Sequence, residues 1–278
     1  MFRSQSPREH LRTRVALAFV AVALACMHIP MGAYGSETAK IKVAFMPYTL
    51  GRSTAISSVV TIGTTDGSLP SPLVKFNIRF PSSLTGLISN LGLAICSPTL
   101  LEIGPEYCPT NSLLGTGYVH AGLFVAGQTI TEKAEVDVFM GPPRGEQIGV
   151  LVYTATNSPL QSQTIFQGEL VSGTGDFGEL LEAKVPLVET WPEGNDVVMT
   201  YMQLSIDPST LRYHRHFRGT VVSYHPRGFE LPQVCPAGGF PFNASLVFSD
   251  GTQISAADVI PCPKSYRRRR KNMTADMR

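Results

Sequence analysis

An apolar residue at every second position is the feature of this 278-residue sequence that most restricts its fold. The clearest example is LVKFNIRF at residues 73–80, in which Lys75, Asn77 and Arg79 alternate with apolar residues. Successive side chains of a β-strand point to opposite faces, so this pattern predicts a strand with one buried face. Further strands are predicted at residues 40–46, 55–62, 118–125, 130–140, 164–171, 180–187, 197–206, 219–224, 240–248 and 252–259. A continuous apolar run predicts a buried strand at residues 149–154.

The composition favours many short strands over long helices. The chain contains 25 glycines and 21 prolines, while only 16% of its residues are charged. That balance is typical of strands joined by tight turns. Asp250-Gly251 is a strong turn signal between the last two predicted strands. We therefore expect an all-β fold, an antiparallel β-sandwich, formed by a single domain over residues 36–263.

One or two short helices are expected within this β framework. Apolar residues at i, i+3, i+4 and i+7, starting from Leu84, predict a short amphipathic helix within residues 81–91. A single helical turn is expected at residues 99–103, where Gly104-Pro105 ends it.

The first 35 residues have the organisation of a signal peptide. Four arginines precede an apolar run at residues 15–29, and Ala33-Tyr34-Gly35 matches a small-residue cleavage site. The run is short for a transmembrane anchor, which needs about 20 apolar residues. We expect cleavage near Gly35. The alternative is a lipid anchor on Cys26, although the leucine that usually begins such a motif is missing.

Four cysteines remain after the predicted cleavage: Cys96, Cys108, Cys235 and Cys262. An even number of cysteines in an exported chain indicates disulfides, here two, and four cysteines allow several pairings. We favour the local pairs Cys96–Cys108 and Cys235–Cys262, since each encloses a compact, turn-rich segment. Zinc is the alternative, but the sequence lacks C-x-x-C and Cys/His pairs at ligand spacing.

These cysteines belong to a longer pattern of turn residues. Its members are Cys96, Cys108-Pro109, Ser112, Gly115, Gly117, Glu132, Cys235-Pro236, Phe248, Asp250-Gly251 and Pro261-Cys262. The pattern resembles a group of uncharacterised exported actinobacterial proteins with a Cys-Pro-rich all-β region, and the likeness covers roughly residues 74–262. It differs at Phe240, where tryptophan is common in the group. The resemblance implies fold and export, and no activity that can be carried over.

The most unusual composition in the predicted domain is RYHRHFR at residues 212–218. On a strand, Arg212, His214, His216 and Arg218 share one face, which suggests an anion-binding surface. A transition-metal site that adds His225 is an alternative, although the flanking arginines oppose a cation. A third interpretation is a solvated edge strand whose charges discourage pairing with other sheets.

Charge is divided unevenly along the chain. Residues 36–263 carry 12 Lys and Arg against 19 Asp and Glu, a net charge of −7. Residues 264–278 carry 7 against 1, a net charge of +6. We expect this tail to be disordered and to contact an anionic envelope polymer or lipid surface. Its cations are Arg267, Arg268, Arg269, Arg270 and Lys271. A tail without a partner is the alternative, and nucleic acid is not expected because no aromatic platform accompanies the cations.

The sequence contains no clear catalytic motif. G-x-S-x-G is missing, and the glycines at residues 173–178 lack the lysine and following helix of a phosphate loop. Glu132 and Glu135 fall on opposite faces of their predicted strand, which makes a poor acid/base pair. We predict no cofactor and no bound metal. The sequence indicates a secreted or cell-surface protein with a structural or binding role. The alternatives are a secreted metal-dependent hydrolase and a lipid-anchored ligand-binding protein.

Overall fold

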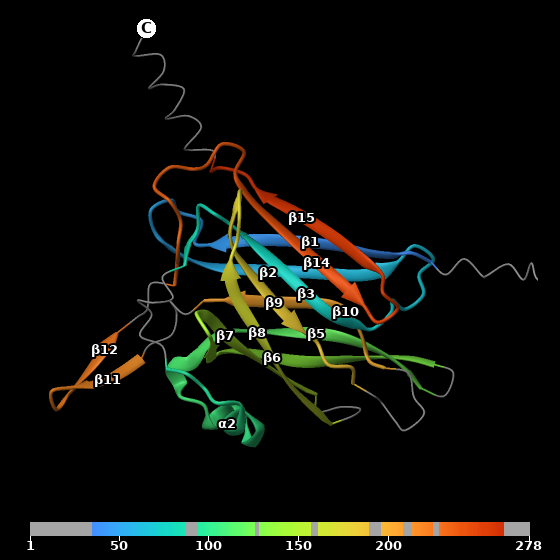
Figure 1. Ribbon diagram of the computed structural model, residues 1–278, viewed down its shortest axis with the longest axis horizontal. Helices are drawn as coiled ribbons and strands as arrows, with labels where there is room; N and C mark the ends of the chain where they lie inside the picture. The colour runs from blue at the N-terminus through green and yellow to red at the C-terminus, as the bar shows by residue number, and fades with distance from the viewer. Residues whose placement is uncertain are drawn as a thin grey trace, which may run out of the picture. The chain divides into compact units, whose positions relative to one another are not determined.

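The computed structural model describes residues 35–86, 94–125, 128–156, 161–188, 196–207, 213–224 and 228–263 (Figure 1). The chain divides into two compact units, Met1–Gly35 and Ser36–Arg278, and every helix and strand described here belongs to the second. The predicted disordered tail at residues 264–278 lies outside the described residues, as does the predicted signal peptide apart from Gly35.

Strands dominate the described residues. Their bounds are β1 Glu37–Met46, β2 Ser53–Thr64, β3 Leu73–Pro81, β4 Thr85–Gly86, β5 Leu113–Val125, β6 Gln128–Arg144, β7 Gln147–Thr156, β8 Ser162–Ser172, β9 Phe177–Lys184, β10 Val198–Ile206, β11 Tyr213–Phe217, β12 Thr220–Tyr224, β13 Phe229–Glu230, β14 Phe240–Phe248 and β15 Gln253–Ile260. The helices are α2 Pro98–Ile103 and two 3-10 turns, η2 Pro105–Tyr107 and η3 Thr110–Ser112. None of the helices in this part of the chain has the length and apolar character that crossing a membrane requires.

One large antiparallel sheet contains thirteen of the described strands. Its strand order is β15-β14-β3-β9-β8-β7-β6-β5-β10-β2, after which β1 pairs with β2 on one side and β13 and β4 follow on the other. Each of the pairings in the sheet is antiparallel. The strands β11 and β12 form a separate hairpin. The all-β antiparallel prediction is confirmed.

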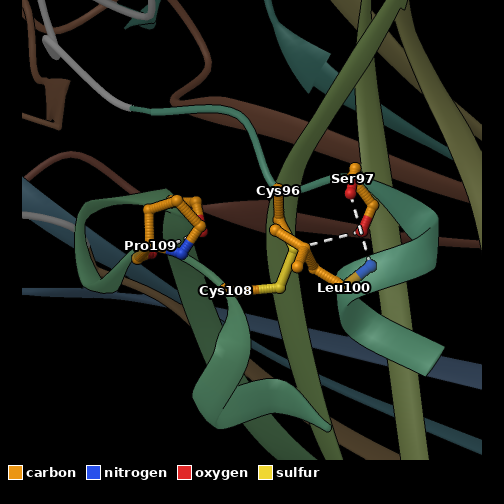
Figure 2. Close-up of a disulfide and its surroundings, with 6 residues drawn as sticks. Cys96, Ser97, Leu100, Cys108 and Pro109 are labelled. Atoms are coloured by element: carbon orange, nitrogen blue, oxygen red, sulfur yellow. Dashed lines mark hydrogen bonds between the residues drawn. A yellow bond between two sulfur atoms is a disulfide. The ribbon is translucent and has the colours of Figure 1, made fainter. Parts of the chain in front are cut away.

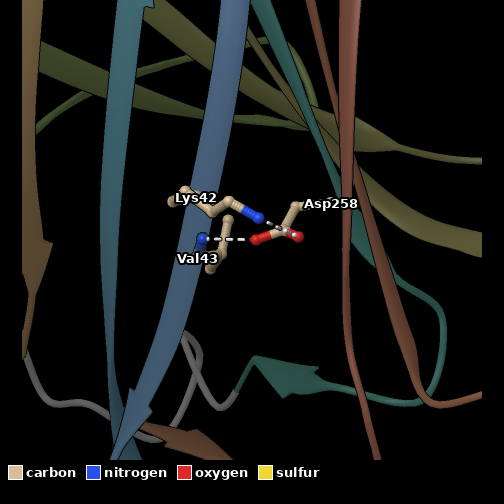
Figure 3. Close-up of polar contacts among 3 residues, drawn as sticks. All are labelled: Lys42, Val43 and Asp258. Atoms are coloured by element: carbon tan, nitrogen blue, oxygen red, sulfur yellow. Dashed lines mark hydrogen bonds and ion pairs between the residues drawn. The ribbon is translucent and has the colours of Figure 1, made fainter.

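The sheet bends round until its two ends meet, which gives it a near-barrel shape (Figure 1). The backbone N–H of Val43 in β1 donates to Oδ2 of Asp258 in β15 at 2.9 Å, and Lys42 Nζ lies 3.5 Å from Oδ1 of the same carboxylate (Figure 3). A side chain, rather than a ladder of backbone hydrogen bonds, thus links the ends. The expected sandwich of two separate sheets is not clearly present. Backbone pairing runs without a break through the whole strand order, from β15 by way of β14, β10 and β2 to β1.

Two glycines in β5 let the backbone of β10 come close. A Cβ on Gly117 would lie 2.9 Å from Cα of Leu204 and closer still to the carbonyl oxygen of Gln203. Gly115 meets the backbone at Ser205 and Ile206 in the same way. Only residues without a side chain allow this approach, so the two glycines favour the curvature of the sheet.

Aromatic side chains fill one half of the interior. In β14 every second residue is buried, beginning with Phe240 and ending with Phe248. The ring of Phe240 packs edge-on against Phe45 of β1 with centroids 5.2 Å apart. Phe242 packs in the same manner against Phe80 of β3 at 6.1 Å. This half, formed by β1, β3 and β14, is a packed core.

The crossover between β4 and β5 forms a second, smaller core on the outer face of the sheet. Cys96 and Cys108 are joined by a disulfide (Figure 2). Together with Leu101 they pack on Phe139 and Leu151. Both contacted residues alternate along their strands with residues that face the interior, so the crossover covers the opposite face. The predicted helical turn is confirmed as α2, which the Ser97 hydroxyl caps by accepting the Leu100 N–H at 3.3 Å (Figure 2).

The second disulfide joins Cys235 to Cys262 beside the β14–β15 hairpin. Both predicted pairings are therefore confirmed. Gly251 in the hairpin turn has φ +88°, which glycine adopts without strain. The helix predicted within residues 81–91 is not borne out at its start, because Thr85–Gly86 is a strand paired with β13. The rest of that prediction, residues 87–91, lies outside the described residues.

Candidate ligand cavity

An apolar cavity of about 180 Å³ occupies the half of the interior that the aromatic core leaves open. Its walls are the inward-facing residues of β3 and of β5 to β10. Alternation along each strand supplies the lining, as in β6, where Val136, Val138 and Met140 face inward while the residues between them face outward. The lining residues that the structure describes include no charged side chain.

Two threonines are the hydrogen-bonding side chains among the described residues of the lining. Thr154 in β7 and Thr164 in β8 lie directly opposite each other in the ladder, and the Thr154 hydroxyl donates to the Thr164 carbonyl oxygen at 3.5 Å. Ligand pockets of proteins are typically apolar with a small number of polar groups that fix orientation. The cavity has this composition.

The cavity is elongated along the strands. Its lining extends along β8 from Thr164 to Leu170, a distance of roughly 20 Å at the rise of a β-strand. Near the threonine end, Pro186 and Leu187 follow β9 and also line the cavity, and Leu187 is 49% exposed. A residue that faces both solvent and cavity marks an opening, so the threonine end is the accessible one.

A polar hollow adjoins the opposite end of the cavity. Ile148 and Leu170 line both spaces. The hollow also contains Glu179, and burial raises the pKa of this carboxyl above its usual value. Arg144 lies there as well, with Nη1 3.0 Å from Oε1 of Glu169. The apolar cavity is thus bordered at this end by a charged hollow.

An apolar cavity of this size can hold a ligand. A dry cavity of about 150 Å³ lined by aliphatic and aromatic side chains binds benzene. Water needs two to four polar partners, and this lining offers two hydroxyls, both at one end. The cavity therefore suits an apolar molecule better than a cluster of water molecules.

The sequence did not predict the cavity, although the inward residues carry a signal. In β3 and β14 the buried inward positions include Phe76, Phe80 and Phe242, whereas β6 and β7 present Val138 and Val150 at the corresponding face. The small inward residues of β6 and β7 leave a space that the large inward residues of β3 and β14 do not fill. Periodicity alone does not reveal this, because both sets are apolar.

The predicted anion-binding residues are not brought to the cavity in the described part of the chain. His214 and His216 are in β11, opposite Ser223 and Val221 of the separate hairpin. Arg218 is an exposed turn residue with φ +49°. Arg212, His225, Arg267, Arg268, Arg269, Arg270 and Lys271 lie outside the described residues.

The structure offers no metal centre in the residues it describes, where no three His, Cys, Asp or Glu side chains gather. The carboxylates of Glu132 and Glu135 lie on opposite faces of β6, the first buried and the second exposed. On the outer face, burial and then the nearby Glu135 carboxylate raise the pKa of Asp137. None of these three carboxylates is among the described residues that line the cavity.

Comparison with protein-family models, curated proteins and solved structures finds no match to this chain. Its function is therefore inferred from the cavity and the surface alone.

Proposed function

We propose that this protein binds an elongated apolar ligand, such as the alkyl chain of a lipid, in the cavity between β3 and β5 to β10. The observation that carries the proposal is the lining, whose described residues are apolar apart from Thr154 and Thr164. The ligand enters at the threonine end, beside Leu187, and its alkyl part lies along β8. A polar end of the ligand then meets either the two hydroxyls or the charged rim near Glu179.

We also propose that the protein acts outside the cytoplasm, at the cell surface or in the surrounding medium. Two disulfides favour an oxidising compartment, and the basic and apolar succession in residues 1–35 supports export. We group it, on its Cys-Pro pattern, with the exported actinobacterial proteins that it resembles. The lipid-anchored and metal-dependent hydrolase alternatives are tested by mass spectrometry of the N-terminus and by metal analysis of the purified protein.

Titration with a fluorescent fatty acid tests the proposed function. Wild-type protein is expected to bind it saturably, with one site per chain. Val138→Phe adds a ring to the cavity wall and is expected to weaken binding at least tenfold, because the ring occupies the ligand's space. The matched control is Val221→Phe, which makes the same change at a 53% exposed valine outside the large sheet.

Circular dichroism of both variants checks that they are folded. Absence of saturable binding by the wild type would refute the proposal, as would equal binding by Val138→Phe and Val221→Phe. Native mass spectrometry of protein purified from an exporting host then identifies any ligand that it retains.

A further inference from the structure

Three exposed apolar residues lie at the end of the fold that the second disulfide fastens. They are Met46, Val234 and Val259, which are 58%, 65% and 50% exposed, and we call them the stapled-end patch. They come from distant parts of the sequence. The Tyr48 hydroxyl donates to the Pro261 carbonyl oxygen at 2.7 Å, which brings the segment after Met46 to the segment after Val259.

Val234, the third residue of the patch, is held at the same end of the fold by a disulfide and by backbone hydrogen bonds. Val234 precedes Cys235, whose disulfide partner Cys262 follows Pro261. The Gly51 N–H also donates to the Leu231 carbonyl oxygen at 3.1 Å, so the loop after β1 and the loop before β14 lie side by side. The three apolar side chains therefore belong to one end of the fold.

The patch residues on strands point away from the core. Phe45 and Ile260, the neighbours of Met46 and Val259, are buried, and alternation turns Met46 and Val259 outward. Burying these two side chains inside the fold would require a one-residue shift of each strand. They are thus available to an external surface.

Two cations of the described residues lie near this patch. Lys42 lies on the same outward face of β1 as Met46, and its side chain is 80% exposed. Arg52 is exposed in the segment whose carbonyl oxygen accepts the Leu231 N–H at 3.0 Å. Two carboxylates also lie in this region: Asp258 pairs with Lys42, and Glu230 follows in β13.

The sequence adds a larger positive charge at the same point. Cys262 is followed by residues 264–271, which contain six Lys and Arg and no acidic residue. The first residue of the arginine run, Arg267, is five residues beyond Cys262, so covalent geometry keeps it within about 18 Å of the disulfide. The sequence therefore tethers six of the chain's 23 Lys and Arg residues within covalent reach of Cys262.

We propose that the stapled end docks on an anionic lipid surface, with Met46, Val234 and Val259 in contact with the interfacial region and the cations in contact with head groups. Each Lys or Arg near such a surface contributes about 1 kcal/mol. A single weak membrane signal gives only marginal binding, and two together give stable attachment. This docking is independent of the proposed cavity function.

A second group of exposed apolar residues, in the crossover, has charged neighbours that do not suit an anionic surface. Ile103 and Tyr107 in the crossover are also exposed, at 61% and 55%, but Glu102 and Glu106 accompany them. An anionic surface repels those carboxylates. The crossover therefore provides a matched control whose side chains are equally exposed and whose charge is opposite.

Cosedimentation with vesicles tests the docking. The purified protein is mixed with phosphatidylcholine vesicles, with and without phosphatidylglycerol, from 0.1 M to 1 M salt. Wild type is expected to bind the anionic vesicles and to keep part of its binding at 1 M salt, where the screening length has fallen to about 3 Å. A variant combining Met46→Ser, Val234→Ser and Val259→Ser is expected to bind at least tenfold more weakly and to lose all binding at high salt.

Two further variants separate the contributions. Replacing Arg267 to Lys271 by serines is expected to abolish the preference for anionic vesicles, and Ile103→Ser is expected to bind as wild type does. Equal binding by the triple variant and the wild type would overturn the proposal and leave a purely electrostatic contact, such as one to a charged polymer. Failure of the wild type to bind vesicles would overturn it too. Thermal unfolding of each variant shows that the fold is kept.

Discussion

Replacing Asp258 by alanine is expected to weaken the closure between β1 and β15 and to destabilise the fold. The Asp258 carboxylate accepts the Val43 N–H at 2.9 Å and faces Lys42 Nζ at 3.5 Å (Figure 3). It is largely buried, with a side chain 16% exposed, whereas that of Lys42 is 80% exposed. The two interactions therefore contribute unequally.

A hydrogen bond from a backbone N–H to a charged acceptor contributes about 1.5–3 kcal/mol net. An exposed ion pair contributes about 0.2–1 kcal/mol, and the exposure of Lys42 puts this pair at the lower limit. Asp258→Ala should thus lower the free energy of unfolding by about 2–3 kcal/mol. For a unit of this size, that corresponds to a fall in Tm of roughly 5–10 °C.

Urea unfolding of three variants tests this partition. Asp258→Asn retains an oxygen that can accept the Val43 N–H and is expected to lose only about 1 kcal/mol. Lys42→Gln should change stability by less than about 0.5 kcal/mol. Asp258→Ala should also speed hydrogen exchange at the Val43 amide. If Asp258→Asn were as damaging as Asp258→Ala, or if Lys42→Gln matched either, the acceptor role of the carboxylate would be wrong.

Three other predictions concern the curvature, the crossover and the outer face. Gly117→Ala should destabilise the fold by about 3 kcal/mol or more, because the new Cβ meets the β10 backbone. The control is Gly63→Ala, whose Cβ would have its nearest neighbour at 3.8 Å. In the same urea assay it should be neutral or stabilise the fold by about 0.5 kcal/mol. Replacing Cys96 and Cys108 by serine should cost roughly 3 kcal/mol in the chain-entropy model, and loss of less than 1 kcal/mol would contradict it. Burial raises the pKa of Asp137 in the folded state, so the fold loses stability as pH rises above the ordinary Asp range and through the raised value. Asp137→Asn should therefore be more stable than wild type at pH 7, and this difference in stability should vanish in acid. A difference that is the same at both pH values would count against the argument.

Much of the local structure followed from the sequence. The alternation in 73–80 predicted β3 with its correct buried face, and the Asp250-Gly251 signal predicted the β14–β15 hairpin. The cysteine pairs were predictable because each joins residues close in sequence. The helix expected from Leu84 was wrong at its start, since pairing of Thr85–Gly86 with β13, distant in sequence, outweighed the local period.

The near-barrel and its cavity depended on pairings that alternation does not encode. Periodicity defines which face of a strand is buried and leaves its neighbours open. The ladder from β5 to β10 and the contact of Asp258 with Val43 join residues far apart in the sequence, and these decide that the sheet closes on itself. The apolar residues of β6 were predicted as a core face, and only the closed shape shows that this face borders a cavity.

The energetics of the cavity give the strongest argument that it has a use. An empty cavity of about 180 Å³ costs roughly 4 kcal/mol at about 24 cal/mol per Å³, which is comparable to the contribution of one of the disulfides. Small changes such as Val138→Phe can fill it, and filling a cavity is a common way to gain stability. If the interior served only to hold the fold together, Val138→Phe would bring a gain with no loss of function. A ligand site instead predicts a trade-off, in which the filled variant is more stable than the ligand-free wild type but no longer gains stability from the fatty acid. At a hundredfold excess of ligand over its Kd, the wild type should gain about 2.7 kcal/mol, so thermal unfolding with and without the fatty acid measures both sides of this trade-off in a single assay.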